Sequence, residues 1–295
     1  MTRRWSSRSL GSRFQHGVFY WLIRFTGLTG AYVLLFFVVT WYAMCPSVRE
    51  RSRAYRQRCF PKAGPLAQLL HLWKLQWHFG LSLVDRAAAG ITGRFVFDDT
   101  AKDKLKTLAG ENKGLILLSA HTGCWQMSPY VLAEHSGLPV TILGHRHEED
   151  IDKQAFEHAG TKAPYTMVGP EQGPLGPVTL IKILRQGELL CMMGDRSFGQ
   201  TEPVVTVPFF GADITVPYLA YRLASASGSP IVFSFALRTG PLQGRLCLEN
   251  VIRVPQGLGS DAGHYRSYAL QYAAALEAFT MKHPYQFFNF FNLWE

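Results

Sequence analysis

The residue best placed for chemistry is a histidine at the end of an apolar run. His121 lies in the segment SAHTGCWQ, residues 119–126, which directly follows the run KGLILL. The run predicts a buried strand, so His121 is expected at the carboxyl end of that strand. An imidazole held at Nδ1 by a hydrogen-bond acceptor can take a proton from a hydroxyl through Nε2. We therefore interpret His121 as a candidate general base.

The residue five positions after His121 is Gln126, where a carboxylate is the more usual partner of a histidine base. If a helix begins in this turn, the amide oxygen of Gln126 can accept the Nδ1–H bond, but it supplies no full charge. The alternative is a structural histidine that caps a helix. Cys124 as a nucleophile is a weaker alternative, because small buried cysteines are common. The sequence has no GxSxG elbow, which disfavours a serine hydrolase.

Strands and helices alternate after residue 93, and this order predicts an α/β fold with a layered mixed sheet and crossover helices. In such sheets, ligands bind beyond the carboxyl ends of the strands. His121, Arg146 and the pair Asp195–Arg196 each follow a predicted strand, so we expect them to converge on one edge. The expected strands are residues 113–120, 139–144, 188–195 and 229–240, and the expected helical segments are 122–136, 150–160 and 176–187.

The composition favours an anionic partner. The chain of 295 residues has a formal net charge of +9, yet only 17% of its residues are charged, against about 25% in a typical soluble protein. No basic stripe is interleaved with aromatic residues, so an anionic membrane surface is favoured over nucleic acid. The five cysteines form no CxxC motif, which argues against a disulfide framework and against a metal site. We expect no metal and no cofactor.

An uncharged segment, Phe25–Pro46, predicts attachment to a membrane. As a helix, its roughly 22 residues would extend about 33 Å, enough to cross a hydrocarbon core of about 30 Å. Both flanks are basic, so the positive-inside rule only weakly favours a cytoplasmic location for the residues that follow the segment. Gly27 and Gly30 could bend the segment, and we therefore expect attachment and leave open whether the helix spans the membrane or lies in its plane.

A second apolar stretch, Pro65–Gly90, places leucines and tryptophans at helical spacing but is too interrupted to span a membrane. It is either a helix packed on the catalytic domain or an anchor that lies on the membrane surface. The expected organisation is an N-terminal membrane anchor with basic flanks (1–62), an amphipathic connecting helix (63–92) and an α/β catalytic domain (93–295).

Four blocks of the sequence, taken in order, resemble the lipid A late acyltransferase family of the lysophospholipid acyltransferase superfamily. The first block is His121, Gly123, Trp125 and Gln126, similar to the family's H-x-G-N-W-E motif. The other three are GDRSFG (194–199), the segment 207–232 and the aromatic tail HPYQFFNFFNLW (283–294). The apolar anchor followed by RSRAYRQRCF is also typical of the family.

The resemblance implies transfer of a fatty acyl chain from a thioester, on acyl carrier protein or coenzyme A, to a hydroxyl of a membrane lipid such as a lipid A precursor. The family's base corresponds to His121 and its acidic partner to Gln126. The resemblance also implies that Trp125, Arg146 and the pair Asp195–Arg196 line the substrate site. Such an enzyme is expected at the inner membrane, with its catalytic domain facing the cytoplasm.

Gln126 departs from the family pattern, and three outcomes follow from this departure. The protein is an enzyme with a neutral orienting residue, an enzyme that uses another carboxylate, or an inactive homologue that binds lipid or carrier protein. The retained Trp125, the GDR motif and the FFG segment (209–211) favour an active enzyme.

Overall fold

A computed structural model describes residues 13–144, 164–169, 176–197 and 203–294. Within these residues a seven-stranded sheet has the order β1-β9-β8-β2-β5-β3-β4, and β6 and β7 form a separate hairpin. The strands are β1 (Val96–Phe97), β2 (Leu115–Ser119), β3 (Val140–Leu143), β4 (Tyr165–Val168), β5 (Leu189–Met193), β6 (Val204–Phe209), β7 (Ala212–Pro217), β8 (Ile231–Gly240) and β9 (Gln243–Ile252). The helices are α1 (Arg13–Met44), α2 (Pro46–Arg51), α3 (Arg53–Cys59), α4 (Pro65–Thr92), α5 (Lys102–Ala109), α6 (Ser128–Ser136), α8 (Gly176–Arg185), α9 (Leu219–Ser227) and α10 (Arg266–Lys282).

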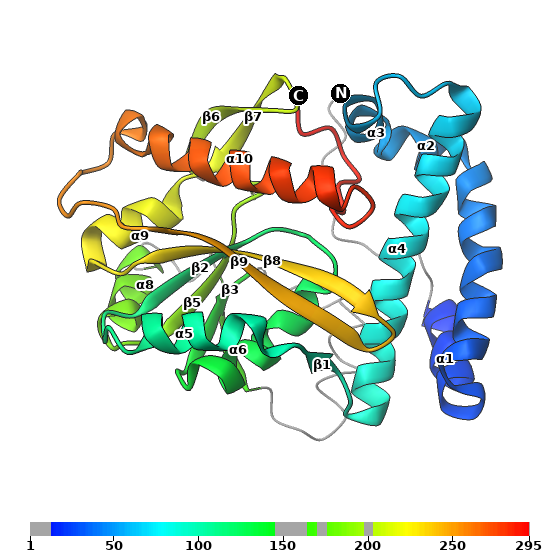
Figure 1. Cartoon of the computed structure of the whole chain (residues 1–295), viewed down its shortest axis with the longest axis horizontal. Coiled ribbons are helices and arrows are strands. Elements are labelled where there is room, and N and C mark those ends of the chain that lie inside the picture. The colour runs from blue at the N-terminus through cyan, green and yellow to red at the C-terminus, as the bar shows by residue number, and fades with distance from the viewer. Residues whose placement is uncertain (1–12, 145–163, 170–175, 198–202, 295) are drawn as a thin grey trace.

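The sheet is covered on both faces, which explains why its central strands are apolar throughout. All five residues of β2 are buried, and successive side chains point to opposite faces. Ile116 and Leu118 pack with α8, α9 and α10, whereas Leu115 and Leu117 pack with α5 and α6. Figure 1 shows α10 across one face of the sheet and α5 and α6 along the other. The predicted α/β class with a layered mixed sheet and crossover helices is confirmed.

The described strands of the sheet are parallel to their neighbours, with one exception. β9 runs antiparallel to β8, and β8 pairs in parallel with β2. The four expected strands appear as β2, β3, β5 and β8, and the expected helix 176–187 appears as α8. The expected helix 150–160 lies outside the described residues. The β6–β7 hairpin was not predicted, although β6 alternates exposed and buried residues as a half-buried strand does.

The N-terminal helix is apolar and kinked. Residues 17–44 have a mean hydropathy of 1.9 in their most apolar window, and the helix is long and apolar enough to cross a membrane. Gly27 has φ 69° and ψ −163°, which interrupts the helix at one of the two glycines where the sequence suggested a bend. The helix that follows the kink has about 17 residues, or roughly 25 Å.

Helix α1 lies alongside α4 for most of its length (Figure 1). A stripe of buried residues, Ala31, Leu35 and Val39, faces α4, and a Cβ at Gly80 of α4 would lie 2.5 Å from Leu35. Away from this stripe, α1 leaves large apolar side chains exposed: Trp21, Phe25, Val33, Phe37, Trp41 and Met44. One face of α1 therefore packs against α4, and the opposite face is exposed in the part of the chain that the structure describes.

Helix α4 packs on the α/β part of the chain, which is one of the two arrangements expected for this stretch. Its residues Leu72 and Leu75 are buried, and Phe79 packs against Phe288 near the C-terminus. Its first turns differ, because Leu66 is 84% exposed and Leu70 is 52% exposed. The middle of α4 therefore packs on the α/β part of the chain, and the first turns of α4 expose apolar side chains.

Candidate functional site

The pairing of β2 with β5 brings the predicted base close to a carboxylate. The two strands are parallel neighbours, with Ser119 opposite Met193. His121 lies two residues after the end of β2, and Asp195 lies two residues after the end of β5. The two residues therefore lie side by side at the carboxyl edge of the sheet. Gly194, between β5 and Asp195, leaves room for the Leu118 side chain and the Tyr272 ring, since a Cβ there would lie 2.9 Å from both. The register of β2 and β5 therefore brings His121 and Asp195 together.

His121 is held by Asp195, and Asp195 is held by Arg196. Nδ1 of His121 lies 2.9 Å from each carboxylate oxygen of Asp195. Nε and an NH2 nitrogen of Arg196 each donate to Oδ2 of Asp195 at 3.1 Å. The Asp195 side chain is 1% exposed and that of Arg196 is 7% exposed, whereas that of His121 is 16% exposed. The guanidinium and the carboxylate are therefore buried, and the imidazole is the one of the three groups that is partly exposed.

The charges fix the protonation state of this chain. Burial alone would raise the pKa of Asp195, but the charge that His121 carries when protonated at low pH, the charge of Arg196 and the hydrogen bonds of both outweigh burial and hold its pKa well below the usual range. Burial, with the charge of Arg196, lowers the pKa of His121, and the opposing pull of Asp195 does not reverse this. Asp195 is therefore ionised and His121 is neutral at pH 7. An ionised carboxylate only accepts, so the imidazole proton is assigned to Nδ1.

The remaining ring nitrogen of His121 is free to act as a base. Nε2 has no hydrogen-bond partner in the described part of the chain, and this nitrogen is not fully buried. Its lone pair therefore reaches the accessible side of the site. A neutral imidazole in this tautomer can accept a proton from a hydroxyl.

The C-terminal tail holds the loop that carries His121. The backbone N–H of Phe288 donates to the carbonyl of His121 at 2.9 Å, and the N–H of Gly123 donates to the carbonyl of Gln286 at 2.8 Å. Arg196 also donates to the carbonyl of Phe288 at 3.2 Å. Gly123 has φ 45°, and a Cβ there would lie 2.4 Å from a backbone oxygen of β8, so only glycine fits. Sequence reasoning did not assign this role to the tail.

An aromatic wall stands beside His121. The ring of Trp125 lies 5.4 Å from the imidazole, measured between centroids, and 5.7 Å from the ring of Phe288. The ring of Phe79, on α4, stacks with that of Trp125 at 6.4 Å and lies 5.0 Å from that of Phe290, both measured between centroids. Trp125, singled out from the sequence, is therefore adjacent to the imidazole. The imidazole therefore lies against an apolar surface.

The hydrogen bond expected between Gln126 and His121 is not made. Residues 125–127 form a single 3-10 turn, and the Nδ1 position is occupied by both oxygens of Asp195. No hydrogen bond joins Gln126 to His121 among those of the described residues. The expectation failed because it assumed that a helix begins directly after His121, whereas the chain first turns through the left-handed Gly123. Arg146, the remaining predicted site residue, lies outside the described residues.

The cysteine alternative also fails on geometry and charge. Cys124 is buried, and its Sγ donates to the carbonyl of Leu237, 3.5 Å away. Burial raises the pKa of this thiol to about 12, so the thiolate that a nucleophile requires is scarce at pH 7. In the ranges that the structure describes, no group of three His, Cys, Asp or Glu side chains is arranged to hold a metal ion.

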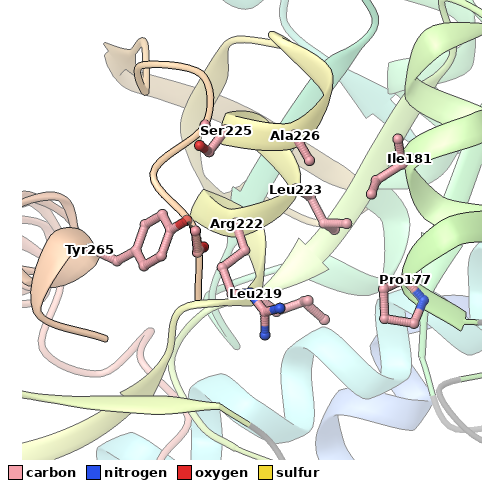
Figure 2. Close-up of a pocket in the computed structure, with 10 residues that line it drawn as sticks. Pro177, Ile181, Leu219, Arg222, Leu223, Ser225, Ala226 and Tyr265 are labelled. Carbon is pink, nitrogen blue, oxygen red and sulfur yellow. Dashed lines mark hydrogen bonds between the residues drawn. The ribbon is translucent and has the colours of Figure 1, made fainter. Parts of the chain in front are cut away.

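A hollow of about 180 Å³ lies away from these residues, between α8, α9 and the loop before α10. Figure 2 shows Pro177 and Ile181 of α8 facing Leu219, Leu223 and the Arg222 side chain of α9. The volume is below the roughly 300–1,000 Å³ of typical ligand sites. None of its lining residues belongs to the His121 site, so we do not assign catalysis to it.

The fold and the site define a class: an α/β protein with a histidine–aspartate pair at the carboxyl edge of its sheet, joined to an apolar N-terminal helix. Comparison with known families narrows this class. The family model described as bacterial lipid A biosynthesis acyltransferase matches residues 92–295, which is more than half of the chain, and the chain belongs to this family. Among curated proteins, none matches the chain.

Proposed function

We propose that the protein transfers a fatty acyl chain from a thioester, on acyl carrier protein or coenzyme A, to a hydroxyl of a membrane lipid, with His121 as the general base. Membership of the family supports acyl transfer to lipid in general. The observation that carries the role of His121 is its contact with Asp195 at 2.9 Å, which leaves Nε2 free.

The proposed reaction needs one base and no covalent intermediate on the protein. Nε2 of His121 takes the proton of the acceptor hydroxyl while the oxygen attacks the thioester carbonyl. The tetrahedral intermediate then collapses, the C–S bond breaks, and the imidazolium returns the proton to the leaving sulfur. The products are an ester and a free thiol. Asp195 stays ionised throughout and stabilises the imidazolium, as the aspartate of a catalytic triad does.

The pair Asp195–Arg196 removes the main reason for doubting activity. The inactive alternative rested on the missing carboxylate at position 126, but the carboxylate of Asp195, just beyond β5, lies at Nδ1 of the imidazole. Arg196 fixes the orientation of Asp195 through two hydrogen bonds. We therefore favour the second of the three outcomes, an enzyme that uses another carboxylate, and assign Trp125 to the wall of the substrate site.

For location, we propose that α1 contacts the bilayer through one face. Its exposed aromatic and aliphatic side chains need an apolar environment. Its other face runs along α4, which carries Lys74, Asp85 and Arg86 and therefore cannot lie in hydrocarbon. These features together favour a helix embedded from one side, in an anionic membrane that attracts a chain of net charge +9.

The membrane we propose is the inner membrane, with the catalytic domain facing the cytoplasm, because the thioester donors are cytoplasmic. We also retain the division into an anchor (1–62), a connecting helix (63–92) and a catalytic domain (93–295). Fractionation of the intact protein tests this part. Recovery of most of the protein in the soluble fraction, without detergent, would refute it.

The role of His121 is tested with the full chain purified in detergent. Acyl transfer from labelled acyl carrier protein and from labelled acyl coenzyme A to a total membrane lipid extract is compared for the wild type and His121→Ala. We expect the variant to lose about 10²–10⁴-fold in rate, the usual contribution of a general base. Lys106→Gln, on the exposed side of α5, is the control for handling of the protein. Equal rates for wild type and His121→Ala would rule out His121 as the base.

A further inference from the structure

A second group of basic side chains surrounds the ring of Tyr285, outside the His121 site. Nδ1 of His71 lies 2.9 Å from the hydroxyl of Tyr285, and Nζ of Lys74 lies 5.5 Å from the centroid of its ring. The imidazole of His78 stacks with the same ring at 5.9 Å between centroids. His71, Lys74 and His78 recur at helical spacing on α4, so one face of the helix presents all three to the C-terminal tail.

This cluster has positive charge but no carboxylate. None of the salt bridges among the described residues involves Lys74, His71 or His78. Burial, with the charges of Arg238 and Lys74, lowers the pKa of His78, and burial, with the charges of Lys74 and Arg56, lowers the pKa of His71. Cationic neighbours therefore act on both imidazoles. An anion at this position would be stabilised by the same charges.

The cluster also has an unused hydrogen-bonding atom. Nδ1 of His78 is buried and has no partner among the described residues. The side chains of His71, Lys74, His78 and Tyr285 are only partly buried, so a ligand can reach them from solvent. Buried polar atoms are normally satisfied, and here an unpaired nitrogen lies in a group that also holds a cation with no counter-ion, so an anion that accepts hydrogen bonds suits the cluster.

The surroundings identify the source of that anion. The exposed residues Leu66 and Leu70 lie in the first two turns of the same helix, and Leu70 is one turn before Lys74. Trp73, between them, donates to the Thr40 hydroxyl of α1 at 3.1 Å, so the cluster lies on the helix that packs against α1, the helix that we assign to the membrane. A basic cluster beside apolar side chains at this boundary matches a lipid whose phosphate lies at the bilayer surface.

We propose that His71, Lys74 and His78, grouped around Tyr285, bind the phosphate of an anionic membrane lipid. The proposal rests on the membrane attachment proposed above, but it does not depend on catalysis by His121. The bound lipid lies near the reaction site, because the next residue in the tail, Gln286, holds Gly123, and the residue after His78, Phe79, stacks on Trp125.

The test measures lipid binding without any thioester, so an inactive protein would still give a clear result. The full chain in a non-ionic detergent is titrated with phosphatidylglycerol or with phosphatidylcholine, and bound lipid is counted by native mass spectrometry. We expect saturable binding of phosphatidylglycerol only. Lys74→Gln should weaken it about fivefold, since one basic residue near a lipid surface contributes about 1 kcal/mol. Lys74→Arg keeps the charge and should retain binding.

Lys62→Gln is the matched control, because it removes one charge from the exposed turn before α4 and lies outside the cluster. Equal losses in Lys62→Gln and Lys74→Gln would mean diffuse surface attraction and would overturn the site. Equal binding of the two lipids by the wild type would also overturn it. Inorganic phosphate and coenzyme A are added as competitors. Displacement of the lipid by either at equal concentration would assign the site to a soluble phosphate instead.

Discussion

Asp195 and Asp85 are both about 1% exposed, and each accepts a hydrogen bond from an arginine. Arg238 of β8 donates to Oδ2 of Asp85 at 2.7 Å, much as Arg196 donates to Asp195 at 3.1 Å. The two pairs differ in what else the carboxylate holds. Asp195 holds an imidazole that reaches solvent, whereas Asp85 holds the hydroxyl of Tyr32 and a backbone N–H.

The comparison separates two uses of a buried charge. Every partner of Asp85 is a donor from a different part of the fold: α1, β8 and the β8–β9 turn. This network ties the apolar helix to the catalytic domain and leaves no group for chemistry. Asp195 instead binds one group that can change its protonation state. We infer that the Asp85 network serves stability and the Asp195 network serves catalysis.

The largest stability effect is expected at Asp85. Asp85→Asn leaves Arg238 buried without its counter-charge, and breaking a buried pair in this way costs about 3–5 kcal/mol. The apparent Tm in detergent should fall by on the order of 10 °C. Acyl transfer per folded molecule, measured well below that Tm, should stay within a few-fold of wild type. An unchanged Tm, or a loss of activity in fully folded protein, would contradict the assignment of the Asp85 network to stability.

A smaller effect is expected for the link between α1 and this network. Tyr32→Phe removes one hydroxyl that donates to Asp85 and accepts from Arg238 at 3.1 Å. The cost should be about 0.5–1.5 kcal/mol, the net value of a typical hydrogen bond, because Asp85 and Arg238 remain paired. Thermal unfolding measures the change, and acyl transfer should be unaffected. A destabilisation as large as that of Asp85→Asn would mean that the hydroxyl, not the ion pair, dominates the network.

The smallest effect concerns pH. The proposed base, His121, can accept a proton only when it is neutral, and its pKa is lowered from the ordinary value of about 6.5 by burial and by Arg196. The rate should therefore be flat near pH 7 and fall only as the pH drops below about 6.5. In Asp195→Asn the attraction that favours imidazolium is lost, so the acid limb should move to still lower pH. An acid limb above pH 7 in the wild type would contradict the assigned charges.

Much of this fold follows from local patterns in the sequence. The apolar runs of β2, β3, β5 and β8 predict buried strands, because a sheet covered on both faces needs apolar side chains on both sides. The uncharged run in α1 predicts the N-terminal helix, and Gly27 marks its kink. Candidate site residues at strand ends follow from the same patterns, which is why His121 and Asp195–Arg196 could be named in advance.

The partner of His121 could not be named in advance, because it depends on the order of strands in the sheet. Residues 121 and 195 are far apart in the chain, and only the pairing of β2 with β5 brings them together. A signal existed, since each residue follows its strand end by the same distance. The role of the tail was hidden for the same reason, because Gln286 and Phe288 reach the His121 loop from the other end of the chain.

The central claim is that Asp195, and not Gln126, orients His121. The most direct test measures kcat/KM for acyl transfer by wild type, Asp195→Asn and Gln126→Leu at one pH, with folding of each checked by thermal unfolding. We predict a loss of about 10⁴-fold for Asp195→Asn, as for the corresponding change in a serine protease triad, and less than about threefold for Gln126→Leu. A large loss in Gln126→Leu together with near wild-type activity in Asp195→Asn would contradict the account.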